Sequence, residues 1–105
     1  MTLTQADNGT TVTIRPGEQV AISLAENPTT GFQWALEQGD DAILKLLDSA
    51  YVRAAGPDLG SGGRRVLTFE AKNSGTVRLR LKLWRAWEGD SSIRERFEIT
   101  IQVTN

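Results

Sequence analysis

The stretch V-R-L-R-L-K-L-W, residues 77–84, decides the fold class. Its apolar residues alternate strictly with Arg78, Arg80, Lys82 and Trp84, so an extended chain would present one apolar and one polar face. Such alternation predicts a half-buried β-strand. The cations along it are then the solvent-facing side of a strand, and we expect no surface for nucleic acid or for an anionic membrane.

The same alternation recurs on both sides of this stretch. Inward faces are expected at Val12 and Ile14; at Val20, Ile22 and Leu24; at Phe32, Trp34 and Leu36; at Leu67, Phe69 and Ala71; at Val77, Leu79, Leu81 and Leu83; and at Phe97, Ile99, Ile101 and Val103. Short strands at regular spacing, separated by turn residues, predict an all-β, immunoglobulin-like antiparallel β-sandwich of about seven strands. We expect Trp34 to be its core indole, and residues 1–105 to form a single domain.

One segment, residues 40–54, does not fit this alternation. Ile43, Leu44, Leu46 and Leu47 match helical spacing about as well as strand spacing. We interpret the segment as an irregular turn or helix-like piece that leads into a strand around Tyr51 to Ala54.

Composition excludes several classes of site. The chain has 105 residues, a net charge of -1, and neither cysteine nor histidine. Disulfides, thiolate metal sites and Ser-His or Cys-His catalysis are therefore excluded, and we expect no metal and no cofactor. The N-terminus M-T-L-T-Q-A-D has neither the basic nor the apolar region of a signal peptide, which favours a cytoplasmic protein unless a leader has been removed. We expect the protein to be a monomer when free.

Three unusual connections should emerge at one end of the sandwich. If successive strands run up and down, the connections Asn27 to Gly31, Gly56 to Arg64 and Arg85 to Ser92 share an end. Each has a plain structural interpretation: a proline-stiffened turn, a glycine-rich hairpin loop, and a tryptophan packed back on the sandwich. Their coincidence at one end favours a binding surface.

Three motifs in these connections resemble a known family. N-P-T-T-G-F at 27–32, G-S-G-G at 60–63 and R-A-W at 85–87 are similar, in this order, to the signature loops of the chagasin-like inhibitors of papain-family cysteine peptidases. The resemblance spans essentially the whole chain, and the first motif is the most specific. Ala86 stands where the family pattern has proline, and this departure costs rigidity in the third loop.

The resemblance implies a reversible, non-covalent inhibitor, not an enzyme, whose three loops block the active-site cleft of a papain-family cysteine peptidase. The implied peptidase-binding residues are Asn27, Pro28, Thr29, Thr30, Gly31, Phe32, Gly60, Ser61, Gly62, Gly63, Arg85 and Trp87. An uncharged first loop can enter a narrow cleft at little desolvation cost, and Pro28 reduces the entropy lost on ordering. The glycines allow close approach to the peptidase backbone, and Trp87 is expected to stack on one of its aromatic residues.

Three other classes remain as alternatives. A pure interaction domain within a larger assembly would leave the specific set of loops unexplained. A carbohydrate-binding or adhesion module would use Trp84 and Trp87 as a platform for sugar rings. An enzyme built on carboxylates alone is conceivable, yet Asp58, Glu88 and Asp90 have the pattern of ordinary solvated charges.

Overall fold

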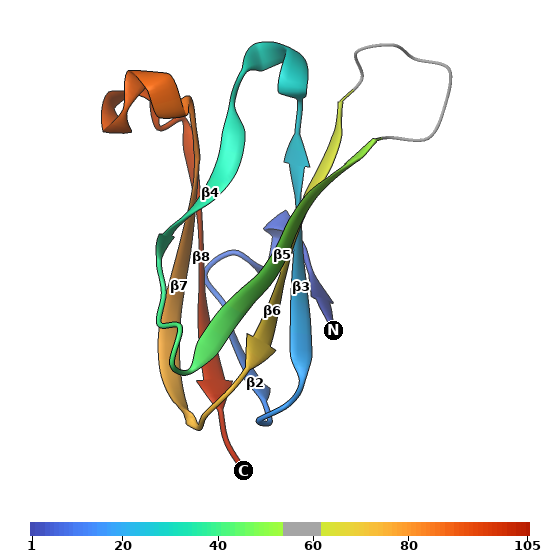
Figure 1. The fold of residues 1–105 in the computed structure, drawn as a ribbon, viewed down its shortest axis with the longest axis vertical. Coiled ribbons are helices and arrows are strands. Elements are labelled where there is room, and N and C mark those ends of the chain that lie inside the picture. Colours follow the sequence, from blue (N-terminus) through green and yellow to red (C-terminus); the bar gives the residue numbers. More distant parts are fainter. Residues whose placement is uncertain (54–61) are drawn as a thin grey trace.

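Two packed β-sheets make up the computed structural model, which describes residues 1–53 and 62–105 (Figure 1). One sheet has the order β1 (Thr2–Leu3), β3 (Gln19–Glu26), β6 (Gly63–Ala71) and β5 (Leu44–Arg53). The other has the order β2 (Thr11–Ile14), β8 (Glu95–Val103), β7 (Gly75–Trp84) and β4 (Gln33–Gln38). The predicted immunoglobulin-like sandwich is confirmed, and the strand beyond the predicted seven is the two-residue β1.

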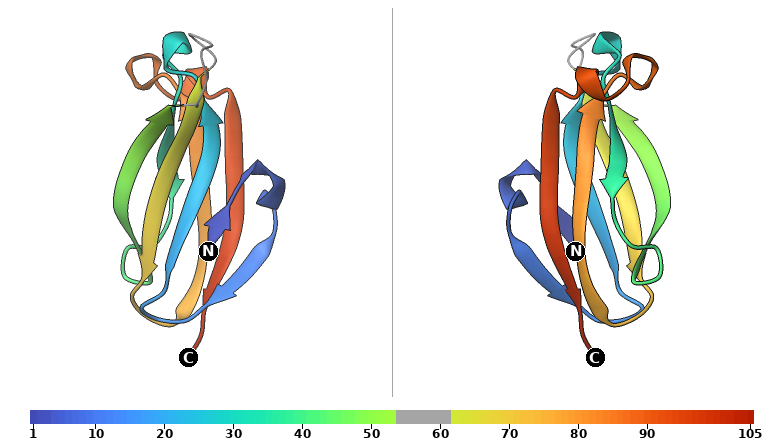
Figure 2. Two further views of the ribbon diagram at one scale, coloured as in Figure 1. Left: turned by 90° about the vertical axis from the view of Figure 1, so that its right-hand side faces the viewer. Right: turned by 90° about the vertical axis from the view of Figure 1, so that its left-hand side faces the viewer.

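Short 3-10 turns join several strands: η1 (Gln5–Asp7), η2 (Pro28–Thr30), η3 (Ala86–Glu88) and η4 (Asp90–Ser92). The long strands pair antiparallel, as expected, but β1 pairs with β3 and β2 pairs with β8 in parallel. The turn η1 lies between β1 and β2 and takes the chain from the edge of one sheet to the edge of the other (Figure 2). Within the described part of the chain, no helix is long and apolar enough to cross a membrane.

The core lies between the sheets and consists mainly of residues that alternation placed inward, joined by Leu3 and Leu44. Phe32, which was expected to face inward, is only partly buried and is not part of this core. The buried apolar residues are Leu3, Ile14, Val20, Ile22, Leu24, Trp34, Leu44, Leu67, Phe69, Ala71, Val77, Leu79, Leu81, Phe97, Ile99, Ile101 and Val103. Val12, Leu36 and Leu83 pack against them while partly buried. Trp34 is only 2% exposed, which confirms it as the core indole.

The prediction for residues 40–54 was partly wrong: residues 41–43 form the expected turn, but the strand begins at Leu44 and not around Tyr51. Leu44–Arg53 is one strand, β5, which pairs with β6 along its length, and Ala54 lies outside the described residues. The register shifts between Leu46 and Asp48, so Leu47 is an extra residue and is 44% exposed. A β-bulge breaks the period of two, and the two adjacent leucines then imitate helical spacing.

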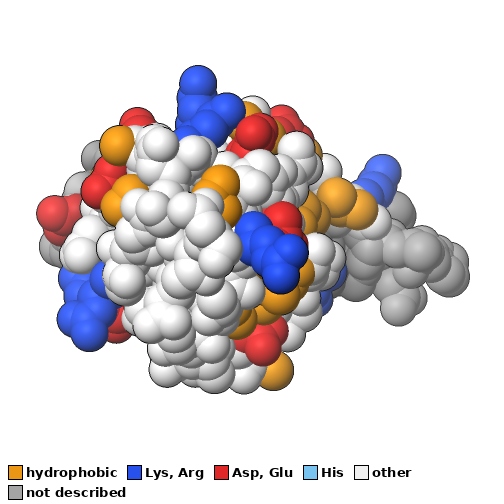
Figure 3. Space-filling model, turned by 90° about the horizontal axis from the view of Figure 1, so that it is seen from below, with side chains coloured by type: hydrophobic (Ala, Val, Ile, Leu, Met, Phe, Trp, Pro, Cys, Tyr) orange, Lys and Arg blue, Asp and Glu red, His pale blue; other side chains and the backbone are white. Residues whose placement is uncertain are grey.

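The strand registers place the three connections at one end, as the alternation of direction predicts. Gly63 at the start of β6 pairs with Glu26 at the end of β3 and with Arg53 at the end of β5, while Gln33 pairs with Trp84. We call Asn27–Phe32 the first loop, the connection between Arg53 and Gly63 the second loop, and Arg85–Ser92 the third loop; the first and third lie together at the top of Figure 1. Seen from the opposite end, basic and acidic side chains are interspersed (Figure 3).

Candidate functional site

The first loop is a 3-10 turn fastened by its own side chains. Asn27 adopts φ -118° and ψ 105° and caps the turn, because its Oδ1 accepts hydrogen bonds from the Thr29 amide at 3.1 Å and the Thr29 hydroxyl at 2.7 Å. Pro28 occupies the first position of the turn, where its fixed φ is favourable. Gly31 ends the turn in the left-handed region at φ 79°, a conformation that favours glycine.

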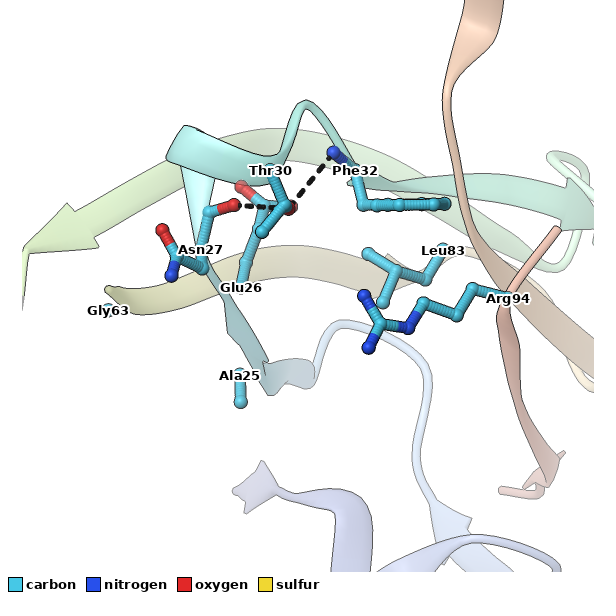
Figure 4. Close-up of a pocket in the computed structure, with 8 residues that line it drawn as sticks. All are labelled: Ala25, Glu26, Asn27, Thr30, Phe32, Gly63, Leu83 and Arg94. Atoms are coloured by element: carbon cyan, nitrogen blue, oxygen red, sulfur yellow. Dashed lines mark hydrogen bonds between the residues drawn. The ribbon is translucent and has the colours of Figure 1, made fainter. Parts of the chain in front are cut away.

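The hydroxyl of Thr30 closes the inner side of the same loop. It donates to the Asn27 carbonyl at 2.7 Å and accepts from the Phe32 amide at 3.3 Å (Figure 4). Pro28 and Thr29 are exposed, whereas Asn27, Thr30 and Phe32 are partly buried. The motif therefore divides into an exposed tip and residues that hold the tip in place.

The third loop consists of η3 and η4 and is fastened at its base. Ser92 Oγ donates towards carbonyls of Gly89 and Arg85 at 2.6 and 3.0 Å, and it accepts from the Arg85 amide at 3.0 Å. Trp87 sits within η3 and is 73% exposed, the highest value among the large hydrophobic residues of the described ranges. An indole left in water at this level is available for a partner.

Arg85 and Trp87 join the third loop to the first. The Arg85 guanidinium donates to the Thr30 carbonyl from Nε at 3.1 Å and from Nη2 at 2.9 Å, and it lies 4.4 Å from the centre of the Phe32 ring. The edge of the Trp87 indole rests on Gly31, where an added Cβ would be 2.7 Å from the ring. These contacts commit the Arg85 side chain to the first loop, and a further bond to Glu88 at 3.0 Å uses Nη1.

Part of the second loop lies outside the described residues. The predicted site residues Gly60 and Ser61 fall in that part. Gly62 adopts φ 80°, and a Cβ on it would come within 3.2 Å of the Glu26 carbonyl and 3.3 Å of Asn27 Cβ. Gly63 belongs to β6, where any side chain would collide with the Val52 carbonyl. Structural demands thus explain glycine at both positions, and Gly62 lies against the base of the first loop.

Sequence reasoning missed a buried ion pair beneath the first loop. Glu26, 5% exposed, bonds to Arg65 at 2.9 Å and to the Trp34 amide at 2.8 Å. The alternation of inward residues could have revealed the pair. Residue 26 is the next inward position after Val20, Ile22 and Leu24, and residue 65 is the inward position two residues before Leu67.

A pocket of about 230 Å³ opens beside Glu26. Its lining residues are Ala25, Glu26, Asn27, Thr30, Phe32, Gly63, Leu83 and Arg94. Figure 4 shows Arg94 and Leu83 on one side of it and Asn27 with Thr30 on the other. Arg94 also lies 5.3 Å from the centre of the Phe32 ring. Two arginines, Arg85 and Arg94, therefore lie near this ring.

The outer face of the β4–β7–β8 sheet does not offer Trp84 as a platform. The Lys82 amino group lies 3.5 Å from the centre of the Trp84 ring and is bonded to Asp90 at 3.1 Å. Below it Arg80 pairs with Glu98 at 3.0 Å. Arg96 hydrogen-bonds to Glu37 across the same face and thereby lowers the pKa of that carboxyl below its usual value.

Comparisons with known proteins find relatives along nearly the whole chain. The family model described as chagasin family peptidase inhibitor I42 matches residues 13–101. Chagasin from Trypanosoma cruzi is 35% identical over 104 residues, which cover 95% of this chain and 94% of chagasin. Amoebiasin-1 from Entamoeba histolytica is 29% identical over 94 residues, covering 90% of this chain and 91% of that protein.

Solved structures show the same fold. The cysteine protease inhibitor EhICP2 from Entamoeba histolytica superposes with a TM-score of 0.89 at 21% identity, covering 98% of this chain and 94% of its own. PbICP-C, solved in complex with falcipain-2, gives a TM-score of 0.71 at 15% identity and covers 99% of this chain and 90% of its own. The carbohydrate-binding alternative finds no support among these relatives.

Proposed function

The chain belongs to the chagasin family of cysteine peptidase inhibitors, and from this premise we propose that its three loops together block the active-site cleft of a papain-like cysteine peptidase. The single observation that supports this mode best is the pairing of an uncharged exposed tip, Pro28 and Thr29, with the exposed indole of Trp87 at the same end of the sandwich. A standard interface of roughly 800 Å² per partner would be sufficient for tight binding.

The first loop enters the cleft at the catalytic centre in this proposal. No charge lies between Asn27 and Gly31, so burial of the tip desolvates only neutral groups. The internal hydrogen bonds of Asn27 and Thr30 order the tip before binding, which reduces the entropy lost on association. The Thr29 hydroxyl donates within the loop but keeps acceptor capacity for peptidase donors.

The remaining predicted residues take two kinds of role. Trp87 stacks on an aromatic residue of the peptidase, and the backbone of Gly60, Ser61 and Gly62 runs alongside a peptidase segment. Gly63 lies between Glu26 and Arg53 in the sheet, so its backbone is less available for such pairing. Arg85 acts as a positioning residue, because its guanidinium is engaged by Thr30 and Glu88.

Inhibition is reversible and non-covalent, and the chain has no catalytic activity of its own. Family members are inhibitors, and this chain lacks cysteine and histidine, which removes the common nucleophile-and-base pairs. Occlusion of the cleft then accounts for the whole effect.

Titration of active papain with the folded protein, read out with a fluorogenic peptide, tests the proposal. We expect nanomolar or tighter inhibition that is lost on dilution, with serine and metallo-peptidases unaffected. Arg78→Gln, on the outer face away from the loops, serves as a matched variant that should inhibit like the parent protein. Full papain activity in a large excess of folded protein would overturn the proposal.

A further inference from the structure

Glu26 is the only buried charged residue in the described part of the chain, and it directly precedes the first loop. Its side chain is 2% exposed. Transfer of a carboxylate out of water is unfavourable unless charged or polar partners surround it. A location this costly, adjacent to the proposed binding loop, calls for a role that an apolar residue would not fill.

The partners of the Glu26 carboxylate come from two other strands. Arg65 of β6 donates from Nη2 to Oε2 at 2.9 Å and from Nε to both oxygens at 3.2 and 3.3 Å. The backbone amide of Trp34, in β4, donates to Oε1 at 2.8 Å. Both oxygens are therefore engaged, and the described residues contain no buried side-chain N or O atom that lacks a partner.

The bond to Trp34 crosses from one sheet to the other. Glu26 ends β3, and Trp34 belongs to β4, the edge strand of the opposite sheet, so an amide facing away from β7 has no neighbouring strand. The Trp34 indole makes a second crossing bond, from Nε1 to the Ala25 carbonyl at 2.9 Å. Together these bonds fix the separation of the two ends of the first loop.

Arg65 extends the same arrangement to β5 and β6, the strands that flank the second loop. It lies two residues after Gly63, the first residue of β6, which pairs with the last residue of β5. Its Nη1 also reaches Ser49 Oγ of β5 at 3.4 Å. One buried carboxylate is thus connected to the strands that flank both the first and the second loop.

We propose that Glu26 is a positioning residue for peptidase binding, whose buried carboxylate, shared by Arg65 and the Trp34 amide, sets the spacing of the first loop and its position relative to β5 and β6. The inference rests on the proposed function. Without the carboxylate, the two ends of the first loop can separate, and only a fraction of molecules holds the binding-competent spacing. Apparent affinity then falls by that fraction.

The test compares Glu26→Gln with a control substitution at Arg64, the residue next to Arg65 in β6. Gln keeps the shape and one acceptor for Trp34 but removes the charge that Arg65 needs. Arg64→Gln is the control, because Arg64 bonds within its own sheet to Ser23, at 2.6 Å to Oγ and 2.8 Å to the carbonyl oxygen. Melting curves and rate constants for papain are measured for each variant at a temperature where it is fully folded.

Both variants should melt at a lower temperature, and only Glu26→Gln should lose affinity. We expect a rise of about tenfold in its inhibition constant, mainly through slower association, because fewer free molecules are competent. Arg64→Gln should inhibit within about twofold of the parent. A purely stabilising role of Glu26 predicts a lower melting temperature with an unchanged inhibition constant, and that result would overturn the inference while leaving the proposed function intact.

A double variant keeps the test decisive if Glu26→Gln does not fold. In Glu26→Gln with Arg65→Gln, the two amides can bond to each other and no buried charge remains. We expect this double variant to fold and still to associate with papain about tenfold more slowly than the parent. A single hydrogen bond between two neutral amides holds the loop less firmly than the charged hydrogen bonds between Arg65 and Glu26. Parent-like association would overturn the inference. Failure of the parent protein itself to inhibit papain would instead refute the proposed function.

Discussion

The first and third loops begin with the same backbone pattern but are held in different ways. Each begins with an extended residue, Asn27 at φ -118°, ψ 105° and Arg85 at φ -102°, ψ 108°. Each continues as a three-residue 3-10 turn followed by a glycine with positive φ, Gly31 at φ 79° and Gly89 at φ 77°. The loops diverge there, because ψ is -7° at Gly31 and -165° at Gly89, which leads into η4. The first loop has proline at the first position of the turn and a side-chain cap, and the third has Ala86 and no side-chain cap.

The difference shows that the rigidity of one loop depends on the other. The first loop stands on the buried pair beneath it and on its own hydrogen bonds. The third loop is fastened at its base by Ser92, and Arg85 then ties it to the Thr30 carbonyl of the first. We therefore expect changes below the first loop to affect the whole molecule, and changes in the third loop to affect binding alone.

The core beneath the first loop should show the largest effect. Trp34→Ala removes a side chain that is 2% exposed, together with the indole bond to the Ala25 carbonyl. The free energy of unfolding should fall by about 3–5 kcal/mol, the usual cost of truncating a buried tryptophan. Chemical denaturation followed by circular dichroism measures this change. A loss below about 1 kcal/mol would show that the first loop does not depend on the packing under it.

The tip of the third loop should show the opposite behaviour. Trp87→Ala removes an exposed indole, so the free energy of unfolding should remain within about 0.5 kcal/mol of the parent value. Affinity for papain should fall by at least about 2 kcal/mol, roughly thirtyfold, because a stacked tryptophan is a typical hot spot. Inhibition constants and melting curves on the same preparations separate the two effects. A destabilised variant with unchanged inhibition would reverse the assignment of core and interface.

Alternation predicted most of the fold because it is a local record of burial. It placed Trp34 and the apolar faces of β3, β6, β7 and β8 inward, and the regular change of strand direction placed the loops at one end. It failed at Leu47, where a bulge shifts the period without any residue that marks a bulge. The parallel pairing of the short β1 and β2 depends on contacts with distant strands that local pattern does not contain.

The candidate site was predicted as a set of residues, but their division of labour was not. The motifs of the first and third loops did not distinguish two kinds of residue. Asn27, Thr30 and Arg85 mainly hold the loops in place, whereas Pro28 and Trp87 are exposed. Which side chain turns inward depends on hydrogen bonds between residues as far apart as Thr30 and Arg85, and spacing within one motif does not reveal them. Contact with a peptidase stays a prediction for all of them.

The contact between the two loops can be broken from the side of the first. Gly31→Ala introduces a Cβ 2.7 Å from the Trp87 ring at a positive φ. Gly17→Ala, at φ 91° with nothing within 4 Å, is the matched control at the opposite end of the sandwich. Both variants should lose about 1–2 kcal/mol of stability, because alanine is strained in the left-handed conformation. The clash in Gly31→Ala should add little to this loss, since the exposed Trp87 indole can rotate away.

Only the substitution in the first loop should change inhibition. Displacement of Trp87 should lower the affinity of Gly31→Ala for papain by about tenfold, or ~1.4 kcal/mol, while Gly17→Ala inhibits like the parent. Inhibition constants of the two variants at one temperature, with both folded, give the comparison. Equal inhibition by both would mean that the resting place of Trp87 on Gly31 has no part in binding.

The smallest expected effect comes from making the third loop more like the first. Ala86 is the first residue of η3, its amide makes no hydrogen bond to the described residues, and Arg85 before it already has the extended conformation that precedes proline. Ala86→Pro should therefore stiffen the free loop by about 0.4–1 kcal/mol, and Pro28→Ala should loosen the first loop by a similar amount. Affinity for papain should rise a few fold in Ala86→Pro, chiefly through slower dissociation, and fall a few fold in Pro28→Ala. Association and dissociation rates of both variants against one peptidase decide the matter. A tenfold loss of affinity in Ala86→Pro would mean that the bound third loop needs a backbone at Ala86 that proline forbids, and the likeness of the two loops would then hold only for the free protein.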